Sequence, residues 1–233
     1  MIIETHPNIE MIKVVAKRLG ELINEVAFLG GATTGLLITD QAVSEIRPTK
    51  DVDVIIELYS RIEFQKLEEK LRTLGFKNSI EPDSPICRWI VDDIIVDVMP
   101  TDEEILGFSN TWYSKALKES TKVTINNDIS IRLVTSPYFC ATKIEAFYGR
   151  GNNDFLGSHD IEDIITIIDG RKEIIDEIAK SSEALQAFLS EHFQTFLKDD
   201  NFLESISAQF NPDPVSQKRC DIIIDRIKII TGQ

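Results

Sequence analysis

The 233-residue sequence is poor in cysteine and histidine, with three of each. Cys87, Cys140 and Cys220 are odd in number and far apart, which argues against a disulfide framework and against a zinc site. The histidines are equally scattered, so a histidine-rich metal centre is not expected. The odd number and wide spacing of the cysteines favour reduced thiols, as in a cytoplasmic protein.

Long apolar runs are also missing. No stretch approaches the roughly 20 residues that a membrane-spanning helix needs. The first residues, Met1 to Pro7, lack a basic start followed by an apolar run, so no signal peptide is expected. The sequence therefore predicts a cytoplasmic protein with no membrane partner.

Positive charge is scarce: the sequence has 25 Lys and Arg but 39 Asp and Glu, so the net charge is −14. Indiscriminate nucleic-acid binding needs a basic surface and is not expected. The composition does not exclude a local basic groove. The candidate residues for it are Arg47, Lys50, Lys115, Lys118, Lys122, Arg132, Lys143 and Arg150.

The apolar pattern divides the chain at about residue 135. Before that point the sequence predicts helices at 8–24, 61–74 and near 111–118, and strands at 26–29, 51–58, 86–91, 94–99, 122–125 and 129–133. After Ser136 the strand signal disappears and about five helices are expected, the first starting at Ser136-Pro137. We predict an α+β fold, with a mixed β-sheet domain flanked by helices at 1–135 and a helical domain at 136–233.

Three carboxylates are the first candidates for chemistry. Asp51 and Asp53 begin the apolar strand predicted at 51–58, and side chains two residues apart share a face, roughly 7 Å apart. Asp97 joins them if its own strand, 94–99, pairs beside 51–58. Crowded carboxylates repel each other, and Mg²⁺ prefers hard oxygen ligands of this kind. The alternative is a pair of solvated charges at a strand start.

A glycine pair follows the strand predicted at 26–29. Gly30 and Gly31 lead into a helix expected to run to about Ile38, and such a turn offers backbone N–H groups to phosphate. Thr33 or Thr34 can add a hydroxyl. The spacing matches neither the dinucleotide-binding nor the P-loop fingerprint, and an ordinary tight turn is the alternative.

The helical half carries a second constellation. Lys143 and Arg150 are seven residues apart and lie on nearly the same face of one helix. Ser158 is expected to cap a helix that contains Asp160 and Asp163, which are neighbours at i and i+3. The two cations can meet triphosphate oxygens, with the acids orienting them. A simple tie between two helices is equally open.

Taken together, these segments resemble the AbiEii-type nucleotidyltransferases of the DNA polymerase β-like superfamily, which include toxins of bacterial toxin–antitoxin systems. The resemblance covers residues 25–170 and rests on Gly30-Gly31, segment 47–53, Asp97, and segments 143–150 and 158–164. It departs from the family in having Gly-Gly where Gly-Ser is common, and in a long spacing from Asp53 to Asp97.

The resemblance implies Mg²⁺-dependent transfer of a nucleotide from a nucleoside triphosphate (NTP) to an acceptor such as tRNA, another RNA or a protein. It allows an antitoxin protein as a partner. It makes Asp51 and Asp53 metal ligands, and Asp97 a third ligand or the base. The candidate nucleotide-binding residues are then Gly30, Gly31, Thr33, Lys50, Lys143 and Arg150.

Two other functions stay open. A small-molecule nucleotidyltransferase of the antibiotic-modifying, aminoglycoside-like sort would use the same sheet site with a drug pocket lined by acids, which the acidic chain favours somewhat. A non-catalytic member that binds nucleotide or a partner protein is the third. The presence of all three carboxylates favours an enzyme.

Overall fold

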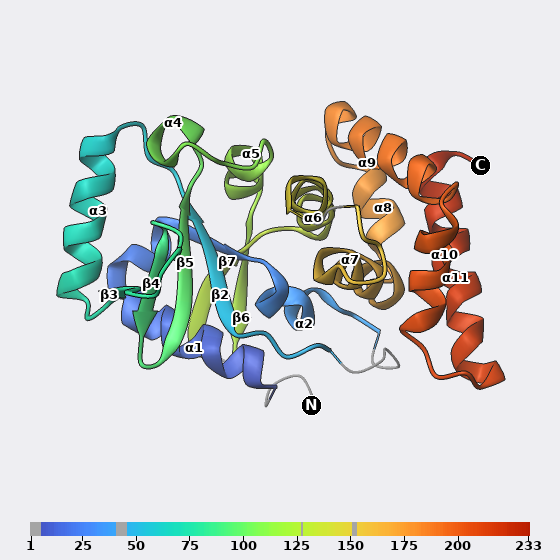
Figure 1. Ribbon diagram of the computed structural model, residues 1–233, viewed down its shortest axis with the longest axis horizontal. Coiled ribbons are helices and arrows are strands. Elements are labelled where there is room, and N and C mark those ends of the chain that lie inside the picture. Colours follow the sequence, from blue (N-terminus) through green and yellow to red (C-terminus); the bar gives the residue numbers. More distant parts are fainter. Residues whose placement is uncertain (1–5, 41–45, 127, 151–152) are drawn as a thin grey trace. The chain divides into compact units, whose positions relative to one another are not determined.

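The computed structural model describes residues 6–40, 46–126, 128–150 and 153–233. They form two compact units, seen in Figure 1. The sheet unit comprises residues 6–36 and 47–135, and the helical unit comprises residues 37–40, 46 and 136–233. Residues 37–40 depart from the predicted domain boundary because they bond to helical residues: the amides of Thr39 and Asp40 donate to the Gly170 carbonyl.

The sheet unit is built on a seven-stranded sheet in the order β3–β4–β5–β2–β1–β7–β6. Parallel pairing joins β2 to β5 and β1 to β7, and the other neighbours are antiparallel. A mixed sheet with flanking helices confirms the α+β class. The strands are β1 (Val26–Leu29), β2 (Asp51–Ile56), β3 (Lys77–Asn78), β4 (Arg88–Val91), β5 (Ile94–Pro100), β6 (Thr121–Ile125) and β7 (Ile129–Leu133).

Helices of the sheet unit follow the predicted periodicity. The helix expected at 8–24 is α1 (Pro7–Leu19) continued by the 3-10 turn η2 (Gly20–Asn24), with a break where Gly20 takes a φ of 55°. The helix expected at 61–74 is α3 (Arg61–Thr73), capped by the Ser60 hydroxyl and buried through an apolar stripe. The remaining turns and helices are η3 (Gly31–Thr33), α2 (Thr34–Leu37), α4 (Glu103–Leu106) and α5 (Tyr113–Lys118).

Some details differ from the sequence-based expectation. The helix after the glycine pair is a single turn, α2, because it is preceded by the 3-10 turn η3. The short strand β3 and the one-turn helix α4 were not predicted, since two and four residues are too few to show a period.

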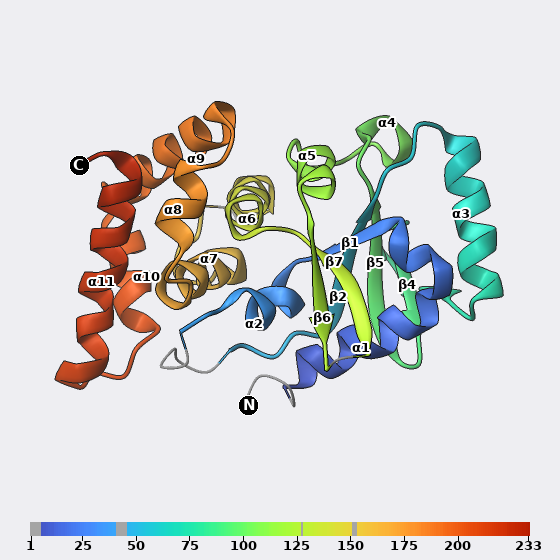
Figure 2. The same cartoon turned by 180° about the vertical axis from the view of Figure 1, so that it is seen from behind.

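The helical unit contains α6 to α11, one helix more than expected, and no strand among its described residues. Ser136 begins α6 and the Ser158 hydroxyl caps α7 by accepting the Ile161 amide, both as predicted. Aromatic rings fill its core: Phe155 lies 4.8 Å from Phe147 and 5.1 Å from Phe196 between ring centroids. The helices are α6 (Ser136–Arg150), α7 (His159–Gly170), α8 (Ile174–Ala179), α9 (Glu183–Phe196), α10 (Asp200–Ala208) and α11 (Pro214–Thr231), as Figure 2 also shows.

None of the helices in the described part of the chain combines the length and hydropathy that crossing a bilayer requires.

Candidate functional site

The pairing of β2 with β5 brings the three predicted carboxylates together. Asp53 stands directly beside Asp97 across the two parallel strands, and Asp51 lies two residues earlier on β2, on the same face. One carboxylate oxygen from each of the three lies within 4.8 Å of the other two. Asp97 was expected to join Asp51 and Asp53 only if its strand paired beside theirs, and β5 does pair beside β2.

Gly30 leaves room for one of these carboxylates. It follows β1, where Leu29 pairs with Asp53, and its φ of 77° lies in the region that favours glycine. A Cβ atom at Gly30 would lie 1.9 Å from Oδ2 of Asp53, which is far inside contact distance. Any other residue here would displace the carboxylate, so Gly30 is required by the geometry of Asp53.

The rest of the glycine turn is less suited to phosphate than the sequence suggested. Gly31 opens a 3-10 turn, and α2 is one turn long, so the helix dipole available there is small. The Thr33 hydroxyl donates to the Gly30 carbonyl at 2.8 Å and so stabilises the turn itself. The buried Thr34 hydroxyl has no hydrogen-bond partner among the described residues, and is the more available of the two.

Arg88, which the sequence analysis did not single out, holds the third carboxylate. It faces Asp97 across the antiparallel pair β4–β5. Its Nε and Nη2 donate to the two oxygens of Asp97 at 2.9 and 2.7 Å, a bidentate ion pair. These hydrogen bonds raise the pKa of the guanidinium above its usual value, against the effect of burial. Asp97 is therefore fixed in orientation, and one negative charge of the cluster is balanced.

Cys87 lies beside this pair but is not suited to bind a metal. Burial, and then the negative charge of Asp97, raise the pKa of its thiol to about 12. The thiolate, not the thiol, is the metal-binding form. The cluster therefore offers oxygen ligands only.

A buried asparagine fixes the segment that leads into β2. The Asn8 side chain, 1% exposed, donates to the Arg47 carbonyl at 3.0 Å and accepts the Thr49 amide at 2.9 Å. Both backbone groups lie just before Asp51, so α1 anchors the start of the carboxylate strand. Lys50, a predicted nucleotide-binding residue, is exposed in this segment.

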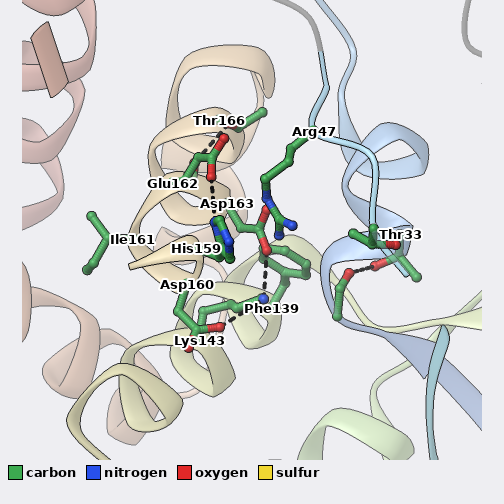
Figure 3. Close-up of polar contacts among 12 residues, drawn as sticks. Thr33, Arg47, Phe139, Lys143, His159, Asp160, Ile161, Glu162, Asp163 and Thr166 are labelled. Atoms are coloured by element: carbon green, nitrogen blue, oxygen red, sulfur yellow. Dashed lines mark hydrogen bonds and ion pairs between the residues drawn. The ribbon is translucent and has the colours of Figure 1, made fainter. Parts of the chain in front are cut away.

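The second predicted constellation forms inside the helical unit. Lys143 of α6 pairs with Asp160 at 3.0 Å and with Asp163 at 2.6 Å, both on α7, as Figure 3 shows. Arg150 also pairs with Asp160, at 3.0 Å. Lys143, Asp160 and Asp163 are all buried. The cluster balances two positive charges against two negative ones.

The electrostatics of this cluster keep Lys143 and Asp160 charged. Burial lowers the pKa of Lys143, but the charges of Asp163 and Asp160 outweigh it and leave the pKa raised. Burial raises the pKa of Asp160, but the charge of Lys143 and the Arg150 hydrogen bond outweigh it and leave the pKa lowered. These contacts favour a tie between α6 and α7, and a role of Lys143 or Arg150 in nucleotide binding stays a prediction.

A cavity of about 590 Å³ lies elsewhere in the helical unit, among α8, α9 and the end of α11. Its walls are mainly apolar and include Ile178, Ile229 and Ile230. None of the candidate site residues lines it, so it has no place in the chemistry considered above.

Comparison with known proteins gives little. No protein-family model matches the sequence, and no curated protein is similar to it. The crystal structure of JHP933 from Helicobacter pylori aligns over 96% of this chain and 90% of its own, with 13% identity and a TM-score of 0.48. A presumed nucleotidyltransferase from H. pylori aligns over 97% and 93%, with 10% identity and a TM-score of 0.44. These likenesses are too distant to carry an assignment.

Proposed function

We propose that the chain is a metal-dependent nucleotidyltransferase that moves a nucleoside monophosphate from an NTP to an acceptor hydroxyl. The carboxylate cluster carries this proposal. Asp51, Asp53 and Asp97 converge from two parallel strands, and the absence of a side chain at Gly30 leaves room for the Asp53 carboxylate. The resemblance to the AbiEii-type enzymes, toxins among them, supports the same reaction class.

The three carboxylates fit Mg²⁺. Ligand atoms about 2.1 Å from one ion lie at most about 4.2 Å apart, and a small side-chain rotation brings oxygens within 4.8 Å to that spacing. The donor set is hard oxygen throughout. Asp51, Asp53 and Asp97 would hold the ion, which would neutralise triphosphate charge and lower the pKa of the acceptor hydroxyl.

The chain's own residues then have separable tasks. The strand pair β2–β5 sets the spacing between Asp53 and Asp97, and Arg88 fixes the orientation of Asp97. Gly30 keeps the space beside Asp53 open. Asn8 anchors the start of β2. Catalysis of this kind depends on positioning and electrostatics more than on covalent chemistry by the protein.

RNA is the acceptor that we propose. An acidic chain that acts on RNA must meet phosphates through a few local cations. Lys50 is exposed and Arg47 half-buried in the segment directly before Asp51. Transfer to RNA is then expected to fall steeply with salt, and reversal of Lys50 to Glu to weaken it.

The test is incubation of the protein with each α-³²P-labelled NTP, Mg²⁺ and total tRNA. Label in RNA that disappears with a chelator supports the proposal. Label only in an added aminoglycoside or another small hydroxyl compound keeps the reaction class but refutes the RNA acceptor. Label in no acceptor, with no Mg²⁺-dependent NTP binding, contradicts the enzyme proposal.

Arg88 gives a prediction about this site. Arg88→Gln removes the group that fixes Asp97, and loss of a residue that orients a metal ligand typically costs about 10- to 100-fold in affinity or activity. We expect kcat to fall by that factor, with partial rescue in Arg88→Lys, which restores charge but not the bidentate geometry.

The control for Arg88 is Arg61→Gln, since Arg61 is exposed at the start of α3. Mn²⁺ affinity, measured by electron paramagnetic resonance, separates orientation from charge. Loss of the positive charge alone would strengthen Mn²⁺ binding, whereas loss of the fixed Asp97 orientation weakens it, so weaker binding with slower transfer supports the orienting role. Unchanged kcat in Arg88→Gln would refute it.

A further inference from the structure

The last helix, α11, is apolar on two faces. Its inner face is buried through Cys220, Ile223, Ile227 and Thr231. Its outer face carries Val215, Ile222 and Ile229, which are 76%, 43% and 57% exposed. Ile229 lies where this face meets the cavity beside α8 and α9. Single exposed apolar residues are common, but these three recur along one face of the same helix and form a stripe that charged residues interrupt, among them Lys218 and Asp225.

The spacing of these three residues makes the stripe straight. They recur every seven residues, and seven residues turn an α-helix by about 20° less than two full turns. Val215, Ile222 and Ile229 therefore stay within about 40° of one another around α11. The helix lies at one edge of the helical unit in Figures 1 and 2.

Two opposite charges flank the stripe on one side. Lys218 lies four residues before Ile222 and Asp225 three residues after it, and both are exposed. Neither makes an ion pair within the part of the chain that the structure describes. Along α11 the cation comes before Ile222 and the anion comes after it, on the same flank of the helix. A partner helix whose charges come in the opposite order along this flank would place an anion beside Lys218 and a cation beside Asp225.

We infer that this surface binds a second copy of the chain, with the two α11 helices antiparallel across a twofold axis at Ile222. In that arrangement Ile222 meets its own copy, and Val215 meets Ile229 of the partner at both ends. The twofold axis keeps the charged flanks on the same side, so each Lys218 lies next to the partner's Asp225. On this flank the surface is thus complementary to itself in polarity and charge. On the other flank Arg219 is paired with Asp169, and Arg226 donates to the carbonyls of Ile168 and Asp169, so both arginines are held within the chain.

Self-complementarity is what selects a second copy as the occupant. An unrelated helix would need to supply a matching stripe and a reversed charge pair, whereas the antiparallel copy supplies both from the same residues. Contact through one helix pair buries less surface area than a standard protein–protein interface. The dimer is therefore weak and concentration-dependent.

Sedimentation analysis across a wide concentration range tests this. The wild-type chain is expected to show a monomer–dimer equilibrium. Ile222→Glu places two carboxylates on the axis and is expected to weaken the dimer by at least about tenfold in Kd. Ile80→Glu, at a 95% exposed position of the sheet unit, is the matched control and is expected to change nothing. Thermal melts confirm that both variants fold.

Charge reversal tests the orientation. Lys218→Glu or Asp225→Lys alone places like charges across the axis twice and is expected to weaken the dimer severalfold. The double reversal re-forms both pairs with exchanged signs and is expected to restore the wild-type Kd. Oxidation of Ile222→Cys is expected to yield a covalent dimer, because facing Cα atoms of crossing helices approach within disulfide range.

A chain that stays monomeric at every concentration refutes the inference. A dimer that is insensitive to Ile222→Glu places the interface elsewhere and refutes it too. If each single reversal weakens the dimer and the double reversal does not restore it, the antiparallel twofold arrangement is wrong. These results do not depend on nucleotide transfer, so they stand apart from the proposed reaction.

Discussion

Replacing Asp53 with asparagine is expected to lower nucleotide transfer by at least about a thousandfold, which corresponds to about 4 kcal/mol of lost transition-state stabilisation. Asp53 is the central carboxylate: it stands beside Asp97 across the strand pair and against Gly30 at the end of β1. Asparagine keeps the size of the side chain but removes its charge. Asp51→Asn is expected to act in the same direction, and a chelator to abolish transfer in the wild type.

Folding should survive this substitution, because crowded carboxylates repel one another when no cation is bound. We therefore expect the melting temperature without metal to stay level or rise in Asp53→Asn, while Mn²⁺ binding measured by electron paramagnetic resonance is lost. The matched control is Asp93→Asn in the β4–β5 turn, which is exposed and outside the cluster. Its φ of 62° suits asparagine as well as aspartate.

Two outcomes would contradict the metal-site proposal. One is wild-type transfer by the Asp53→Asn variant. The other is Mn²⁺ binding that survives in the double variant with asparagine at positions 51 and 53. Loss of transfer together with a large fall in melting temperature would instead reflect misfolding, which is why the melt and the metal titration accompany the rate measurement.

The sequence predicts the central strands well because their apolar patterns are strong. The turn at Asp92-Asp93 sets the β4–β5 hairpin, and the apolar runs in β2 and β5 place both strands in the sheet interior. The position of Asp97 beside Asp53 did not follow from these patterns. It depends on which strands become neighbours, and β2 and β5 are joined by a connection of 37 residues, from Glu57 to Asp93.

Arg88 shows a signal that was present but not used. In an antiparallel hairpin the paired residue numbers have a constant sum, and Val91 pairs with Ile94. The same sum pairs Arg88 with Asp97, so the predicted hairpin already contained this ion pair. Asn8 is different, because its contacts with the backbone of Arg47 and Thr49 span about forty residues and leave no local pattern.

Replacing Lys143 with methionine is expected to have the largest effect on stability. Methionine keeps much of the length of the side chain but leaves Asp160 and Asp163 buried without their shared cation. Removing one partner of a buried ion pair typically costs about 3–5 kcal/mol. Lys198→Met, at an exposed position of the helical unit, is the matched control and is expected to cost little.

The loss of folding stability in Lys143→Met should depend on pH in a defined way. The pKa of Asp160 is lowered in the folded state, so its stabilising effect is present above its usual value of 3.8 and is lost as the pH falls through the folded value. The pKa of Lys143 is raised, so its effect is present below 10.5 and is lost as the pH rises through the folded value. Urea unfolding should therefore show the largest difference between wild type and Lys143→Met between these limits.

A double-mutant cycle and a binding measurement complete the test of Lys143. Adding Asp163→Asn to Lys143→Met removes one uncompensated charge, so the double variant should be less destabilised than the sum of the single changes. Affinity for a fluorescent NTP, measured on folded protein, is expected to stay at the wild-type value. If affinity falls while stability does not, Lys143 binds the triphosphate and the tie between α6 and α7 is not its main role.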